Sequence, residues 1–74
     1  MRIQRLIAMA NDIGQYFATR PDPGAASDGV ADHMRRFWDP RMRRQLVAHV
    51  DQTGGEGLHP SVAEGVRRLA DSVA

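Results

Sequence analysis

Two predicted helices meet in the stretch HMRRFWDPRMRR, residues 33–44. Pro40 disfavours helical geometry at Asp39, whereas proline is well accepted as the first residue of a new helix. The Asp39 side chain can then cap that helix by accepting a hydrogen bond from one of its free backbone amides. The Asp39-Pro40 pair therefore predicts a sharp corner between a helix that ends near Trp38 and a helix that begins at Pro40.

Apolar residues recur at steps of three and four on both sides of this corner, which is typical of amphipathic helices. We expect helices over residues 3–19, 25–38 and 40–52, and a fourth that begins at Pro60. The expected apolar stripes, in chain order, are Ile3, Leu6, Ile7, Ala10, Ile13 and Phe17; Ala26, Val30, Met34, Phe37 and Trp38; Met42, Leu46 and Val50; and Val62, Val66, Leu69 and Val73.

Short signals mark the ends of these helices. Ser27 or Asp28 is expected near the start of the second helix, and Gly54 and Gly55 should end the third. No stretch alternates with a period of two for long enough to form a strand. The sequence therefore predicts an all-α fold: a small single domain over residues 1–74, with about four short helices in an orthogonal or bundle-like arrangement.

The chain is short, with 74 residues, and it has no cysteine. A core of this size seldom leaves a free energy of unfolding above about 3–5 kcal/mol. Small domains usually add disulfides, a metal or a partner, and without cysteine neither a disulfide nor a thiolate zinc site can form. We therefore expect association with a partner. The isolated chain should be helical but of low stability, or should self-associate through the apolar surface that the partner would cover.

Positive charge is concentrated at the corner, although the whole chain has a net charge of only +1. Residues 33–44 hold five arginines and one aspartate, and all ten basic residues of the chain are arginine. Codon usage would explain this bias, but arginine also makes planar, bidentate contacts that lysine cannot reproduce. Nucleic acid is an alternative partner for arginine and aromatic side chains, but the near-neutral total and the absence of lysine argue against it.

The sequence offers two candidate partner-binding surfaces. The first is the corner, because tryptophan and arginine are enriched at the energetic centres of protein interfaces. The alternative interpretation of the corner is that Phe37 and Trp38 belong to the core and that the arginines are solvated. The second is a flank of the first helix, outside its apolar stripe. The candidate residues are Arg35, Arg36, Phe37, Trp38, Asp39, Arg41, Arg43 and Arg44 at the corner, and Met9 and Tyr16 on the flank.

Arg43 is distinctive within the corner. A rotation of 100° per residue places it on the apolar side of the third helix, among Met42, Leu46, Val50 and Val47. Because a lone buried charge is costly, its guanidinium should either extend past a packed stem or pair with a carboxylate, on this chain or on another.

No combination of residues indicates catalysis or a bound cofactor. The three histidines fit no metal-binding spacing. Ser27 and Ser61 fall near predicted helix starts, where capping explains them without a nucleophilic role. The glycine-rich run 54–57 lacks the preceding strand and the lysine of a phosphate-binding loop. We expect no catalytic, cofactor-binding or metal-binding residue in this chain.

The N-terminal apolar run does not indicate export or membrane insertion. Asn11 and Asp12 interrupt it, and it is shorter than the apolar region of a signal peptide or the roughly 20 residues of a membrane span. We expect a soluble, cytoplasmic chain that does not contact a membrane.

Four motifs follow one another along the chain: residues 3–9; Ala10-Asn11-Asp12-Ile13-Gly14; residues 31–43, which contain RRFWDPRMR; and Gly54-Gly55-Glu56-Gly57-Leu58. Their order resembles the delta subunit of the cytoplasmic NAD-dependent formate dehydrogenases. The resemblance covers nearly the whole chain, and RRFWDPRMR is its most specific part.

The resemblance implies a non-catalytic accessory subunit that supports the assembly, stability and cofactor acquisition of a molybdenum or tungsten formate dehydrogenase, an enzyme that converts formate and NAD to CO2 and NADH. It implies that molybdopterin and iron–sulfur clusters lie in the alpha subunit, FMN and the NAD site in beta, and a further cluster in gamma. This chain would hold none of them. The alpha subunit is the expected partner, and a small helical nucleic-acid-binding or regulatory protein is the alternative function.

Overall fold

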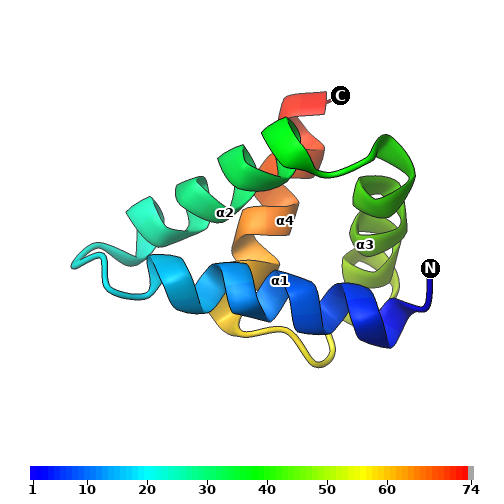
Figure 1. The fold of residues 1–74 in the computed structure, drawn as a ribbon, viewed down its shortest axis with the longest axis horizontal. Helices are drawn as coiled ribbons and strands as arrows, with labels where there is room; N and C mark the ends of the chain where they lie inside the picture. Colours follow the sequence, from blue (N-terminus) through cyan, green and yellow to red (C-terminus); the bar gives the residue numbers. More distant parts are fainter. Residues whose placement is uncertain (74) are drawn as a thin grey trace.

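The computed structural model describes residues 1–73 of the chain, with side chains through Asp71, and these residues form four helices (Figure 1). Their bounds are α1 Ile3–Phe17, α2 Pro23–Phe37, α3 Pro40–Thr53 and α4 Pro60–Val73. No strand occurs within residues 1–73. The predicted all-α fold is confirmed.

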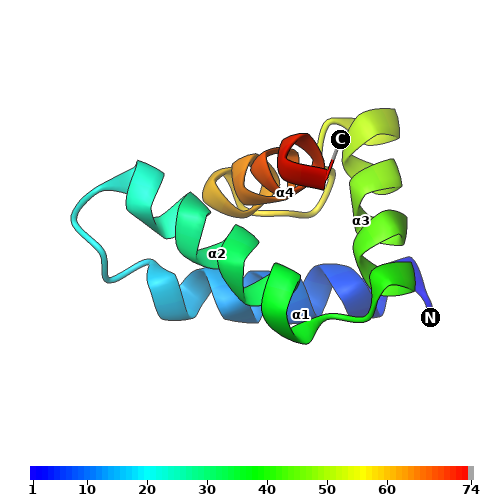
Figure 2. The same cartoon turned by 90° about the horizontal axis from the view of Figure 1, so that it is seen from above.

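The helices are arranged around α4. The contact between α2 and α4 is the most extensive one in the molecule, and α1 also packs against both. Figures 1 and 2 show α3 standing steeply to α1 at the end of the molecule that carries the N-terminus. The resulting shape measures 31 × 24 × 21 Å.

All four helices contribute to one core. The predicted stripes supply its fully buried side chains, which are Leu6, Val30, Met34, Leu46, Val62, Val66 and Leu69. Phe37 departs from the prediction, because it is exposed although its helix position was assigned to the apolar side. Val73, which was predicted to extend the fourth stripe, lies outside the described side chains.

The boundaries of α1 and α2 differ from the predicted ones. The first helix ends at Phe17, and the second begins at Pro23, where the Asp22 side chain accepts a hydrogen bond of 2.9 Å from the Gly24 amide. The predicted start near residue 25 is two residues too late, and Asp22 caps α2 in place of Ser27 or Asp28. The Ser27 hydroxyl is instead buried, and it donates a hydrogen bond of 2.8 Å to the Ser61 carbonyl in the first turn of α4.

The corner between α2 and α3 forms as predicted. The helix α2 ends at Phe37, and the Trp38 amide closes its last turn by donating to the Met34 carbonyl. Asp39 Oδ1 then accepts a 2.7 Å hydrogen bond from the Arg41 amide, while Pro40 occupies the first position of α3. The chain therefore turns within two residues.

The glycine-rich loop after α3 is fastened to α1. Gly54 has a φ of 76°, a left-handed conformation that ends α3 as predicted. Asn11 then binds the loop twice, because its amide donates to the Gly57 carbonyl at 2.9 Å and its oxygen accepts from the His59 amide at 3.1 Å. His49 binds the Glu56 carbonyl at 2.7 Å from the other side.

Two helical glycines allow close helix packing. A Cβ at Gly65 would lie 2.9 Å from the Ser27 carbonyl oxygen and 3.0 Å from Val30, so α4 can approach α2 only without a side chain there. Gly14 plays the same role between α1 and α4, where an added Cβ would collide with Val62.

Candidate partner-binding surface

The structure separates the two aromatic residues of the corner. Trp38 is 7% exposed and joins the core, whereas Phe37 is 72% exposed. The Phe37 ring lies against the His33 ring, with the ring centroids 4.9 Å apart. For Trp38 the core interpretation therefore holds, while Phe37 remains accessible to a partner.

Arg43 binds backbone instead of a carboxylate. Its Nη1 donates a 3.1 Å hydrogen bond to the Arg35 carbonyl in the last turn of α2. Carbonyls in a last turn lack helical partners, so the Arg43 guanidinium satisfies one of them and ties α3 to α2. The carboxylate partner considered for Arg43 is not found among the side chains that the structure describes.

The other four corner arginines fall into two pairs. Asp32, one turn earlier on α2, lies 3.8 Å from Arg35 and 3.2 Å from Arg36 in ion pairs on the helix surface. Arg41 and Arg44 are exposed, and their guanidinium groups have no ion pair or hydrogen bond within the described part of the chain. The free positive charge of the corner therefore lies on α3.

The flank of α1 is also divided between core and surface. Met9 is half-buried and packs against the core. Tyr16 is 75% exposed and meets Phe17 edge to face at a centroid distance of 5.0 Å. This second candidate surface thus presents one exposed aromatic ring.

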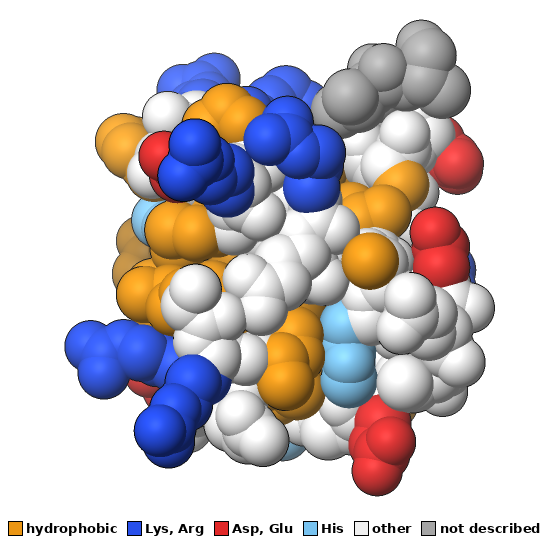
Figure 3. All heavy atoms as spheres, turned by 90° about the vertical axis from the view of Figure 1, so that its right-hand side faces the viewer, with side chains coloured by type: hydrophobic (Ala, Val, Ile, Leu, Met, Phe, Trp, Pro, Cys, Tyr) orange, Lys and Arg blue, Asp and Glu red, His pale blue; other side chains and the backbone are white. Residues whose placement is uncertain are grey.

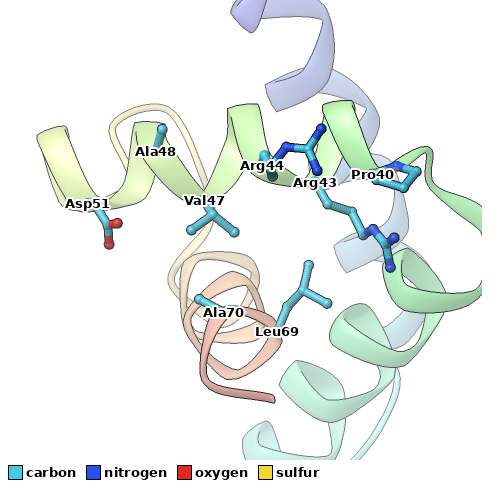
Figure 4. Close-up of a pocket in the computed structure, with 8 residues that line it drawn as sticks. All are labelled: Pro40, Arg43, Arg44, Val47, Ala48, Asp51, Leu69 and Ala70. Atoms are coloured by element: carbon cyan, nitrogen blue, oxygen red, sulfur yellow. The ribbon is translucent and has the colours of Figure 1, made fainter. Parts of the chain in front are cut away.

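A groove between α3 and α4 continues from the corner, and no sequence pattern predicted it. Val47 of α3 and Leu69 of α4 point toward one another across it (Figure 4). In the space-filling view of the side that faces right in Figure 1, arginines gather at the top and at the lower left, and apolar side chains are exposed between these two groups (Figure 3). The lining residues are Pro40, Arg43, Arg44, Val47, Ala48, Asp51, Leu69 and Ala70.

Arg68 joins α4 to the first half of α2, and it too was missed from sequence. It pairs with Asp28 at 2.8 Å and with Glu64 at 3.2 Å, and it donates to the Gly24 carbonyl at 2.8 Å. The hydrogen bond to Asp28, followed by that to Glu64, raises the pKa of Arg68 above its ordinary value. Arg68 therefore stays charged at every pH at which the fold is studied, and its role is structural. The Glu64–Arg68 spacing on a helix was the only sequence signal for it.

The titratable side chains that the structure describes do not assemble a metal site. Among residues 1–71, no three histidine or carboxylate side chains are placed to hold a metal ion. His33 supports Phe37, and His49 holds the glycine-rich loop. None of the described helices is long and apolar enough to cross a bilayer.

Fold and surface together define a small four-helix chain with an exposed aromatic–arginine corner and an apolar groove beside it. A family model described as the NADH-dependent formate dehydrogenase delta subunit, FdsD, matches residues 5–66. The chain belongs to this family, which confirms the resemblance found in the sequence. No curated protein and no solved structure matched the chain.

Proposed function

We propose that this chain is a non-catalytic accessory subunit of an NAD-dependent molybdenum or tungsten formate dehydrogenase, and that it supports assembly, stability and cofactor acquisition by docking on the alpha subunit. The family match over residues 5–66 carries this proposal, because a delta subunit is by definition associated with other subunits of such an enzyme. In this proposal the chain acts in the cytoplasm.

The use of the polar side chains supports a non-catalytic role. Residues that have the chemistry for catalysis make structural bonds here: Asp39 caps α3, Asn11 and His49 hold the glycine-rich loop, and Ser27 links α2 to α4. Each of these groups is already engaged with backbone, so none is poised toward a substrate.

The cofactors of the enzyme are assigned to the other subunits. Iron–sulfur clusters are held by cysteine thiolates, and this chain has no cysteine. Molybdopterin with molybdenum or tungsten, FMN and NAD would likewise lie in the other subunits. This chain would then affect them only through protein contact.

Phe37 is the residue best placed for docking at the corner. Burial of a phenylalanine side chain contributes about 1.5–3 kcal/mol, and 72% of Phe37 is available for it. The neighbouring arginines can bind carboxylates of the partner through charge-assisted hydrogen bonds. The same geometry offers less to nucleic acid, because three of the five corner arginines already bind Asp32 or backbone.

The proposal is tested by producing the formate dehydrogenase with and without this chain. We expect a tagged chain to purify with the alpha subunit at about 0.5 M salt, where binding dominated by phosphate contacts would be lost. We also expect the enzyme made without it to contain less molybdenum or tungsten per alpha subunit and to oxidise formate more slowly. Equal metal content and equal activity in the two preparations would refute the assembly role, and failure to co-purify would refute docking.

A further inference from the structure

One exposed stripe of α3 has a charge order that the helix itself does not explain. Arg44, Val47, Ala48 and Asp51 are spaced three, one and three residues apart, so they share about 100° of the helix circumference. Val47 is half-buried, and the other three are exposed. Positive charge lies at the start of this stripe, negative charge at its end, and small apolar side chains lie between them.

This order opposes the helix dipole. The amino-terminal end of a helix favours acidic side chains and the carboxyl-terminal end favours basic ones, each by about 0.3–1 kcal/mol. The helix α3 has no acidic residue in its first turn and no basic residue in its last turn, where Asp51 lies. Arg44 and Asp51 also have no ion-pair partner among the residues with described side chains. No described side chain therefore accounts for either charge.

The stripe is complementary to itself. If a second copy lies antiparallel across α3, with a two-fold axis between positions 47 and 48, Arg44 faces Asp51 of the second copy and Val47 faces its Ala48. The same relation holds in the opposite direction, so one contact forms two ion pairs around an apolar centre. Ala48 is small enough to allow two helices to approach closely, and antiparallel helix dipoles attract.

We propose that this face of α3 is a self-association surface through which two copies of the chain form an antiparallel, two-fold symmetric dimer. Its apolar floor is the groove between Val47 and Leu69 (Figure 4). The whole chain exposes 4768 Å². A contact that covers about a tenth of this surface on each copy lies near the lower limit for specific interfaces, so the dimer is weak. We expect a dissociation constant between about 1 μM and 1 mM.

This inference does not rest on the proposed function. If the chain dimerises through α3 but never joins a formate dehydrogenase, the α3 dimer is supported and the proposed function is refuted. The reverse result, a chain that joins the enzyme but stays monomeric alone, would keep only the proposed function.

The test is sedimentation equilibrium of the purified full chain up to about 1 mM, together with charge reversals at the two ends of the stripe. In the proposed dimer, position 44 of each copy faces position 51 of the other. Asp51→Arg therefore creates two arginine–arginine contacts, and Arg44→Asp creates two aspartate–aspartate contacts. The double variant restores both pairs with the charges exchanged. Asp12→Arg is the matched control, because Asp12 is exposed on α1 and its reversal changes the net charge by the same amount as Asp51→Arg.

We expect wild type and Asp12→Arg to have the same dissociation constant for the dimer. Each α3 single variant should have a dissociation constant at least about tenfold higher. The double variant should return to within about threefold of the wild-type value. Asp51→Arg should also raise the melting temperature of the dilute monomer, because it places a basic side chain in the last turn of α3. A loss of dimer through unfolding would lower that temperature instead. A monomeric wild type at about 1 mM, or a double variant as weak as the singles, would overturn the proposal.

Discussion

At the scale of single residues, Gly65 decides how closely α4 approaches α2. The atoms that an added Cβ would meet are a backbone oxygen of Ser27 and the branched side chain of Val30, which is fully buried. A backbone oxygen within a helix cannot move away as a flexible side chain can. The most extensive helix contact of the molecule therefore depends on the absence of one carbon atom.

Gly65→Ala should lower the free energy of unfolding by about 1–3 kcal/mol, because the overpacking outweighs the improved helix propensity of alanine. Urea denaturation followed by circular dichroism measures the change. Gly24→Ala is the control, since a Cβ there would meet only the Asp22 carboxylate, at 3.4 Å. If Gly65→Ala has the same free energy of unfolding as the wild type, α4 can move away from α2 without loss of stability, and the account of Gly65 is wrong.

Ser27 shows what sequence alone misses at this scale. Serine is a good helix cap, and its place near a predicted helix start favoured that role. In the structure, Ser27 lies in the second turn of α2, and its buried hydroxyl donates to the Ser61 carbonyl, 34 residues away. Such a role depends on how two helices pack, and no local pattern encodes it.

At the scale of helices, two Asp-Pro pairs set the starts of α2 and α3. Asp22-Pro23 and Asp39-Pro40 form the same hydrogen bond, in which the carboxylate accepts from the amide two residues later, at 2.9 Å and 2.7 Å. The second pair was interpreted correctly from sequence. The first lies between the predicted helices 3–19 and 25–38, so the start of α2 was placed two residues too late.

Asp39→Ala should destabilise the chain by about 0.5–2 kcal/mol through loss of the α3 cap, whereas Asp39→Asn, which can still accept the hydrogen bond, should cost less than half as much. Thermal denaturation of the two variants measures the difference. Equal losses would mean that the negative charge of Asp39, and not its hydrogen bond, stabilises the corner.

At the scale of the whole molecule, the sequence predicted the all-α fold and the family, but not which corner residues face outward. The helical wheel places Phe37 and Trp38 side by side. The extended backbone of Trp38, with φ −89° and ψ 139°, ends the helix at that point, Trp38 is buried in the core, and Phe37 remains in solvent. The α3–α4 groove was missed for a similar reason, since its walls are 22 residues apart at Val47 and Leu69.

The structure also changes which variant tests docking. Arg43→Glu would remove the bond to the Arg35 carbonyl and would weaken the corner itself, so a loss of binding would have two explanations. Phe37 makes little contact within the chain, and its truncation should change stability by no more than about 0.5 kcal/mol. Tyr16 is a matched control, because 75% of it is exposed against 72% for Phe37, and it lies on the other candidate surface.

The most direct test of the docking surface is the affinity of each variant for formate dehydrogenase produced without this chain. We predict that Phe37→Ala binds at least about tenfold more weakly than the wild type, a loss of about 1.4 kcal/mol, while Tyr16→Ala binds as the wild type does. Full affinity of a folded Phe37→Ala variant would contradict docking through the corner. Loss of binding by Tyr16→Ala in its place would assign docking to the flank of α1.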